Sequence, residues 1–196
     1  HPRAVRPHAR HVDIIRARRR RDGKGRRVDL ARILDEHKDE IAAVICEPCF
    51  QAANAMNFYD PKCLAEMRAL CDAHGVLLIF DEIAAGFYRT GPLWAHLSSG
   101  VKPDIMTVGK ALTGGHITLA ATIASEKVAD TISNGSPSAF MHGPTYMANP
   151  LACAAACASL DLFEKENYEQ KVAQIERAFS AGLLPLKGAL PNVRDI

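Results

Sequence analysis

The sequence predicts an α/β protein built on a mostly parallel sheet, in three layers with helices on both faces. Four short apolar runs, at residues 41–46, 76–80, 104–108 and 117–124, alternate with stretches of helical spacing. Runs that are apolar at every position predict strands buried on both faces, as in parallel sheets. The chain has 196 residues, enough for one hydrophobic core or for one domain and the start of another.

The first two expected elements are a helix and a buried strand. Apolar side chains recur at helical spacing within residues 28–40, with charged residues between them. Residues 41–46 (IAAVIC) form an apolar run that ends at Glu47-Pro48, a pair typical of a strand closed by a turn. The alternation of helix and strand begins here.

A second helix follows, and the three remaining apolar runs are the next strands. Asp60 is expected as the N-cap of this helix, with Pro61 at its first position. Gly75 is a favourable residue to end it. Asp81 then follows one apolar run directly, and Lys110 follows the next after a single glycine.

The last third of the chain is predicted to be helical. Residues 150–165 are rich in alanine, and residues 168–187 have an amphipathic pattern. We expect residues 28–165 to belong to a large domain and residues 166–196 to form a helix that leads toward a smaller one. We also expect the sequence to be truncated at both ends.

Residues 1–27 carry eleven Lys and Arg against two Asp. A basic run of this kind is compatible with a nucleic-acid-binding arm. It contains no Phe, Trp or Tyr, however, on which bases would stack. We therefore expect a surface or disordered segment and no nucleic-acid partner, and we keep nucleic-acid binding by a non-catalytic fragment as an alternative function.

The six cysteines are expected to be free, reduced thiols in a cytoplasmic protein. No apolar run is long enough to cross a bilayer, and no apolar signal segment follows His1. Cys46 and Cys49 have the spacing of metal ligands, but no second pair or nearby histidine cluster completes a zinc set. Neither a metal nor a membrane partner is predicted.

Polar side chains stand at the ends of three predicted strands, namely Glu47, Asp81 and Lys110. Ligands of open α/β sheets bind at the carboxyl ends of the strands. Pyridoxal phosphate would use both kinds of group, because a carboxylate keeps its ring nitrogen protonated and a lysine amine binds its aldehyde. Taken singly, Asp81 and Lys110 are also compatible with an ordinary surface turn and an exposed loop lysine.

The local motifs around these residues are more specific. Lys110 lies in Gly-Lys-Ala-Leu-Thr-Gly-Gly, and Asp81 lies in Leu-Leu-Ile-Phe-Asp-Glu-Ile, followed by Gly-Phe-Tyr-Arg-Thr-Gly. Together they resemble the class III aminotransferases, which are fold-type I pyridoxal-phosphate enzymes. The sequence His-Gly-Pro-Thr-Tyr at residues 142–146, with Ala84, narrows the resemblance to the biotin-pathway branch. The resemblance runs from about residue 41 to about residue 163.

The resemblance implies a role for each matching residue. Lys110 would form the Schiff base with pyridoxal phosphate and move the proton, and Asp81 would pair with the ring nitrogen. Ile83 would pack on one face of the ring. Gly143 and Arg89 would lie on the substrate side. A second list belongs to a homodimer with shared sites, in which two residues would reach the phosphate of the partner's cofactor: Pro144 and Thr145.

The implied reaction moves an amino group from S-adenosylmethionine to 8-amino-7-oxononanoate. Alternatives are another class III aminotransferase or an aminomutase, acting on ornithine, γ-aminobutyrate or a semialdehyde. One departure from the family is that the glycines usual after Glu-Pro are absent from residues 50–55, which puts the geometry of that loop in doubt. An upstream aromatic residue and phosphate loop and a downstream arginine also have no match, so we expect the 196 residues alone to have little or no activity.

Overall fold

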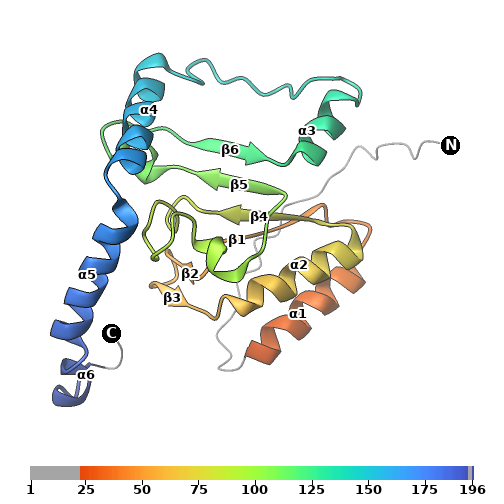
Figure 1. The fold of residues 1–196 in the computed structure, drawn as a ribbon. Helices are drawn as coiled ribbons and strands as arrows, with labels where there is room; N and C mark the ends of the chain where they lie inside the picture. Colours follow the sequence, from red (N-terminus) through yellow and green to blue (C-terminus); the bar gives the residue numbers. More distant parts are fainter. Residues whose placement is uncertain (1–22, 194–195) are drawn as a thin grey trace.

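The computed structural model describes residues 23–193 and residue 196, and its main sheet has the strand order β1-β4-β5-β6 (Figure 1). Strands β1, β4 and β5 are parallel, and β6 runs antiparallel to β5. The predicted α/β class with a mostly parallel sheet is therefore confirmed. The four strands are Ala43–Cys46 (β1), Leu77–Asp81 (β4), Ile105–Val108 (β5) and Ala121–Ala124 (β6).

Two helices, α1 (Gly23–Glu36) and α2 (Lys62–His74), lie side by side on one face of the sheet (Figure 1). Between them and the sheet lies the larger hydrophobic core, in which Leu34, Leu64, Leu78 and Phe80 are fully buried. Burial of each such side chain contributes about 1.5–3 kcal/mol before its entropy cost. This packing fixes the position of β4, the strand that ends on Asp81.

Helix α2 begins and ends close to the predicted residues. The Asp60 carboxylate accepts a hydrogen bond from the Lys62 backbone N–H at 2.9 Å, and the first helical residue is one position later than expected. Gly75 ends the helix with a left-handed backbone, at φ 65°. Glycine adopts this conformation without the steric cost that a side chain brings, so the stop signal was read correctly.

The other face of the sheet is only partly buried in the described residues. Burial alternates along β4 and β5, with the residues of one face buried and those of the other intermediate. The strands read as apolar on both faces because the second set is apolar too, as at Ile45, Leu77, Ile79 and Ile105. The expectation of strands buried on both sides thus holds for one face within this part of the chain.

The C-terminal helices agree with the sequence up to a proline. Helix α4 (Pro150–Lys165) has the predicted bounds, and the Asn149 side chain accepts hydrogen bonds from two of its first backbone N–H groups. The next predicted helix, to residue 187, is wrong in its end. It divides into α5 (Tyr168–Leu183) and α6 (Leu186–Ala189), because Pro185 lacks the N–H that would continue α5.

Other boundaries also differ from expectation. Helix α1 starts at Gly23, inside the segment expected to be irregular, and ends at Glu36 because the charged residues after it have no buried face. The predicted strand 117–124 forms only over its last four residues, since the chain must first turn back toward β5. Helix α3 (Glu126–Ser133) was not predicted. Residues 1–22, which hold most of the basic run, lie outside the described residues.

The loop whose glycines are missing is a short hairpin of β2 (Phe50–Gln51) and β3 (Asn57–Phe58). The chain turns here with Cys49, Ala55 and Met56 at φ of 68°, 54° and 52°. Non-glycine residues therefore take the left-handed backbone conformation that glycine favours, at a cost of about 1–2 kcal/mol each. The loop keeps a tight turn without its glycines.

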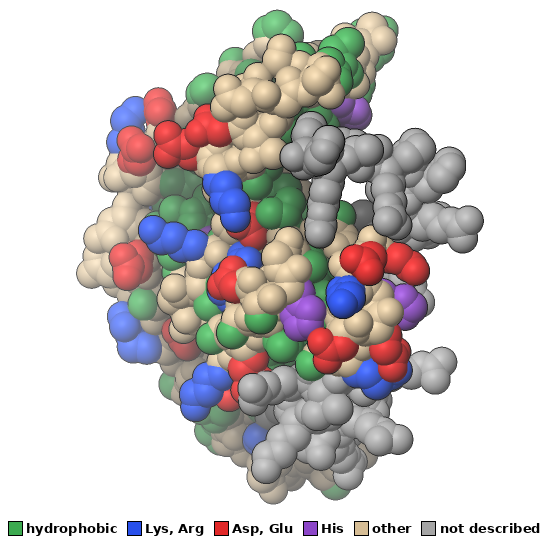
Figure 2. All heavy atoms as spheres, turned by 90° about the vertical axis from the view of Figure 1, so that its right-hand side faces the viewer, with side chains coloured by type: hydrophobic (Ala, Val, Ile, Leu, Met, Phe, Trp, Pro, Cys, Tyr) green, Lys and Arg blue, Asp and Glu red, His purple; other side chains and the backbone are tan. Residues whose placement is uncertain are grey.

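No helix in the described part of the chain is both long and apolar enough to cross a membrane. Figure 2 views the molecule from the right-hand side of Figure 1 and shows Lys and Arg side chains interspersed with Asp and Glu on that face. A nucleic-acid-binding surface would instead gather basic side chains. The visible described residues of this face therefore lend no support to nucleic-acid binding.

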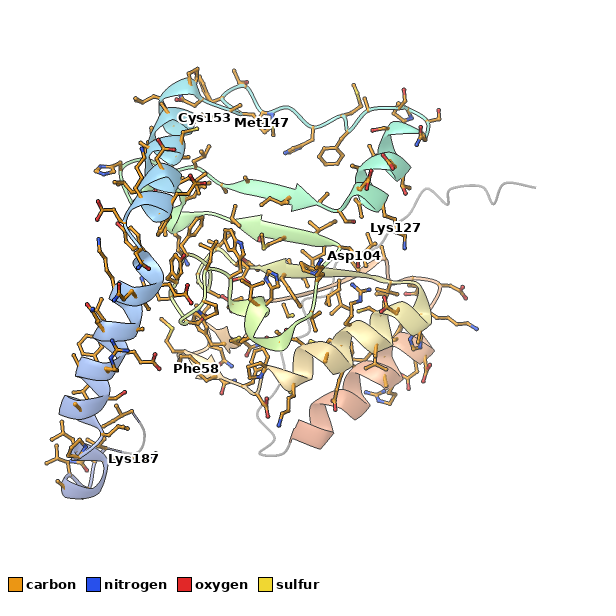
Figure 3. All side chains as sticks on the ribbon, viewed as in Figure 1. Phe58, Asp104, Lys127, Met147, Cys153 and Lys187 are labelled. Atoms are coloured by element: carbon orange, nitrogen blue, oxygen red, sulfur yellow. The ribbon has the colours of Figure 1, made fainter. Side chains whose placement is uncertain are left out.

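Asp104, which precedes β5, links α2 to the sheet at the end away from α4 (Figure 3). Its carboxylate accepts hydrogen bonds from the Leu78 backbone N–H at 2.8 Å and from the Arg68 guanidinium at 2.7 Å. Burial raises the pKa of Asp104, but these two hydrogen bonds outweigh burial and hold the pKa below its ordinary value.

We predict that Asp104→Asn lowers the free energy of unfolding by about 2 kcal/mol near neutral pH. The folded-state pKa of Asp104 is lowered, so this stabilisation is complete above the unfolded pKa of about 3.9 and is lost as the pH falls through the folded value. Denaturant unfolding of the wild type and the variant from pH 7 to pH 2 checks the prediction. A difference that stays constant down to pH 2 would contradict it.

Candidate active site

The carboxyl ends of β1, β4 and β5 bring the three predicted strand-end residues to one edge of the sheet. Glu47 directly follows β1, Asp81 ends β4, and Lys110 comes two residues after β5. Burial raises the pKa of Glu47, a hydrogen bond from the Ala52 N–H lowers it, and the charges of Asp81 and Lys110 act on it in opposite directions. The two carboxylates and the amine therefore lie within electrostatic reach of one another.

The loop after β1 holds Glu47 in place by its backbone and its side chain. The Tyr59 hydroxyl donates a hydrogen bond to the Glu47 backbone carbonyl, and Ala52 N–H donates to the Glu47 carboxylate at 2.9 Å. Tyr59 itself is well buried, and this burial raises the pKa of its hydroxyl, which therefore stays protonated as a donor. The hairpin thus orders one side of the sheet edge.

The Asp81 carboxylate is held by neighbours on both sides. Its Oδ1 accepts hydrogen bonds from the Ile83 backbone N–H at 3.0 Å and from the Thr107 hydroxyl at 3.2 Å. Thr107 is paired with Asp81 across β4 and β5, which explains why the two side chains meet. Within the described residues both hydrogen bonds use Oδ1, so Oδ2 remains available as an acceptor.

Lys110 has an unusual backbone for its residue type. Its φ is 46°, in the left-handed region, and it begins the short 3-10 helix η2 (Lys110–Thr113). Its side chain is exposed. A Cβ on the preceding Gly109 would lie 3.5 Å from Ile83 Cγ2, so Ile83 packs close to the backbone that carries Lys110. A strained lysine at a strand end is an observation that favours a functional role.

A cavity of about 1020 Å³ opens beside Lys110. Residues 83–89, η2 and the facing sides of α4 and α5 form its walls. Its charge-bearing side chains are Arg89, Lys110 and His116, and no Asp or Glu lines it within the described residues. Such a cavity favours an anionic ligand with an apolar part. Its lining includes Ile83 and Arg89 as predicted, whereas His116 was missed because it belongs to no motif.

Aromatic rings hold residues 83–94 against α4 and α5. Phe87 contacts the Trp94 ring edge to face at 4.8 Å and stacks on Phe163 of α4 at 5.4 Å between centroids. Tyr88 and Phe163 both contact Tyr168, the first residue of α5. These contacts support Phe87 and Tyr88 at positive φ, which is strained for aromatic residues.

The structure does not bring Gly143, Pro144 and Thr145 to this cavity. They lie in the exposed segment between α3 and α4, outside the set of residues that line the cavity. Met147, at the end of the same segment, lies next to the start of α4 (Figure 3). Several large apolar side chains of the segment are exposed, among them Met141 at 83% and Tyr146 at 84%. Their predicted roles stay predictions.

No group of three or more His, Cys, Asp or Glu side chains in the described residues is arranged to hold a metal ion. Cys46 and Cys49 contact different neighbours, Met67 Sδ at 3.8 Å and Ser98 Oγ at 3.4 Å. Burial raises the pKa of the Cys46 thiol to about 12, so it is protonated at neutral pH. All six cysteines are free.

Three kinds of comparison connect this chain to known proteins. The family model for class-III aminotransferases matches residues 9–196. The adenosylmethionine-8-amino-7-oxononanoate aminotransferase of Mycobacterium leprae is 51% identical over 163 residues, which cover 83% of this chain and 37% of the relative. The enzyme of the same name from Corynebacterium glutamicum is 50% identical over 160 residues, covering 81% of this chain and 37% of the relative.

Solved structures agree with the sequence relatives. A transaminase from the marine bacterium Virgibacillus has a TM-score of 0.80 at 27% identity, covering 85% of this chain and 38% of its own. An amine transaminase from an uncultivated Pseudomonas species, described as PLP-bound in its internal aldimine form, has a TM-score of 0.76 at 36% identity, covering 86% of this chain and 39% of its own. The chain spans a little over a third of the length of these relatives, and it belongs to the class-III aminotransferase family.

Proposed function

We propose that the protein to which this chain belongs uses pyridoxal phosphate to transfer an amino group from S-adenosylmethionine to 8-amino-7-oxononanoate, a step of biotin biosynthesis. The observation that carries the proposal is the meeting of Asp81 and Lys110 at neighbouring strand ends in a class-III aminotransferase chain. The choice of substrates is supported by relatives about half identical in sequence that are named for this reaction.

The residues at the sheet edge fit pyridoxal phosphate. Asp81 Oδ2 is an acceptor for a ring N–H, because Oδ1 already takes the hydrogen bonds of Ile83 and Thr107. Ile83 offers an apolar side chain beside Gly109, where a flat ring needs a wall. The Lys110 amine reaches the cavity and forms no ion pair among the described residues. When bound, the cofactor supplies an aldehyde and a ring that withdraws electrons from a carbanion.

Each side chain then has a definite task. Asp81, as a carboxylate, keeps the proton on the ring nitrogen by charge and hydrogen bonding. Lys110 binds the aldehyde through Nζ and afterwards uses the same nitrogen to carry a proton between two carbon atoms. Arg89 attracts the carboxylate of a substrate into the cavity, whose apolar walls exclude water. Glu47 orders the neighbouring loop through Ala52.

We further propose that a second copy of the chain covers the segment that carries Gly143, Pro144 and Thr145. The segment is exposed along its length and presents Phe140, Met141 and Tyr146 to solvent. Apolar side chains gathered in this way are typical of a contact surface. Pro144 and Thr145 would then contact the phosphate bound by the partner. The molar mass from light scattering is expected to be that of a dimer, and a monomer would contradict this part of the proposal.

The test uses purified protein from the complete reading frame that contains these residues. Amino transfer to 8-amino-7-oxononanoate is measured with S-adenosylmethionine, ornithine and γ-aminobutyrate as donors, with and without added pyridoxal phosphate. Fast transfer from S-adenosylmethionine that depends on the cofactor is expected. Faster turnover of ornithine or γ-aminobutyrate with their usual acceptors would favour another class-III reaction, and salt-sensitive RNA or DNA binding without transfer would contradict the proposal.

A further inference from the structure

Glu82, the residue after Asp81, is a fully buried carboxylate that the proposed chemistry does not use. Its Oε2 accepts a hydrogen bond from the Ala95 backbone N–H at 3.0 Å. Its Oε1 accepts two more, from the His96 backbone N–H at 3.0 Å and from His96 Nδ1 at 2.8 Å. A buried acid is retained only where donors satisfy it, and here three donors do so.

These hydrogen bonds close a loop at its base. Ala95 and His96 open the short 3-10 helix η1 (Ala95–Ser99), so Glu82 joins the end of β4 to the residues that follow the 83–94 loop. The His96 ring packs on Phe80 at 5.6 Å between centroids, which seats the junction on the core. Inside the loop, Gly86 N–H donates to the Glu82 carbonyl at 2.8 Å. Both ends of the loop therefore depend on one residue.

The 83–94 loop carries the residues that the proposed site needs beside Lys110. Ile83 and Arg89 both line the cavity. The loop packs tightly, because a Cβ on Gly86 would come within 2.9 Å of the Glu82 carbonyl oxygen and of the Trp94 ring. A shift at its base would therefore move the loop as a body instead of being absorbed locally.

Glu82 also acts on Asp81 through the backbone. The Glu82 N–H donates to the Thr107 carbonyl at 2.9 Å, and the Thr107 hydroxyl donates to Asp81. The side chains of adjacent strand residues point to opposite faces, so the two carboxylates anchor the end of β4 from both sides of the sheet. Release of one anchor leaves the other to hold the turn alone.

We propose that Glu82 is a positioning residue for the candidate active site, which rests on the function proposed above. It holds the 83–94 loop so that Ile83 and Arg89 face Lys110, and it fixes the end of β4 that presents Asp81. It touches neither cofactor nor substrate. Its effect reaches both through the loop, so the binding of pyridoxal phosphate and of an anionic substrate depends on its three hydrogen bonds.

The test compares Glu82→Gln with Asp104→Asn in protein from the complete reading frame. Gln nearly matches Glu in shape, but its NH₂ group must face a backbone or ring donor, so at least one hydrogen bond is lost. Asp104 is a matched control because its carboxylate also accepts a backbone and a side-chain hydrogen bond, at the opposite end of β5. Hydrogen exchange of peptides from residues 83–99 is measured without cofactor, and the Kd for pyridoxal phosphate by absorbance.

In Glu82→Gln the amides of residues 83–99 should exchange about tenfold faster, as expected for the loss of one buried hydrogen bond. The Kd for pyridoxal phosphate and the KM of the anionic substrate should rise by a similar factor, with a smaller change in kcat. Asp104→Asn should change none of these three. Unchanged exchange would overturn the proposal, and so would faster exchange with an unaltered Kd and KM, since Glu82 would then be structural only.

Two further outcomes are covered. If Glu82→Gln does not fold, His96→Phe keeps a ring against Phe80 and removes only the side-chain hydrogen bond, and it should show smaller effects of the same kind. If that variant leaves exchange and Kd at wild-type values, the proposal is overturned. Failure of the wild type to bind pyridoxal phosphate would instead contradict the proposed function, because that result does not depend on either variant.

Discussion

Replacement of Lys110 by alanine should abolish the covalent attachment of pyridoxal phosphate and slow transamination by roughly 10³-fold, the scale of a lost proton-transfer group. Lys110 is exposed beside the cavity, and alanine carries the same Cβ at the same strained φ of 46°. The backbone is therefore expected to stay as it is. The variant should lose chemistry while keeping the stability and the fold of the wild type.

Borohydride reduction followed by mass spectrometry gives the direct measurement. In the wild type the reduced adduct should lie on the peptide that contains residue 110, and in Lys110→Ala no adduct should form. Lys102→Ala is the control, because Lys102 is also exposed but lies before β5, at the other end of the strand. A stable adduct in Lys110→Ala would show that another lysine binds the cofactor.

Replacement of Asp81 by asparagine should lower kcat by about 10²–10³-fold, as expected for the loss of a charged group that stabilises developing charge. Asparagine can still accept from Ile83 and Thr107, so the local hydrogen bonds survive while the charge is lost. Without that charge the ring nitrogen holds its proton less firmly, and the absorbance of the bound cofactor should titrate at a lower pH.

Thr107→Val separates the charge of Asp81 from its orientation. It removes the hydroxyl that donates to Oδ1 at 3.2 Å and leaves the carboxylate in place. A loss of about tenfold or less is expected, in line with one neutral hydrogen bond. Steady-state kinetics of both variants check the order of the effects. An Asp81→Asn enzyme as active as Thr107→Val would contradict the role given to the charge.

The strand ends could be predicted because the physics there is local. Each apolar run ends at a polar residue, and parallel strands bring their carboxyl ends to one edge, so Glu47, Asp81 and Lys110 had to be neighbours. The helix breaker Pro185 was also readable, but the amphipathic pattern beyond it was allowed to outweigh the rule that proline ends a helix. That error came from the reading of the signals and not from their absence.

Glu82 and His116 were beyond the reach of the sequence. An acid after a strand is most often exposed, and the partners of Glu82 lie 13 and 14 positions later, at the start of a 3-10 helix with no periodic pattern. Helix α3 is short and has no buried residue, so the apolar periodicity that reveals helices had little to act on. Such features depend on long-range contacts, which only the folded chain displays.

The left-handed backbone at Lys110 has a consequence for the evolution of the protein. Glycine would relieve about 1–2 kcal/mol of strain at this position and return roughly 0.5–1 kcal/mol through the greater freedom of the unfolded chain. Selection for stability alone would therefore favour Lys110→Gly, a change that removes the amine. A lysine that persists at φ 46° marks a place where selection for activity opposes selection for stability.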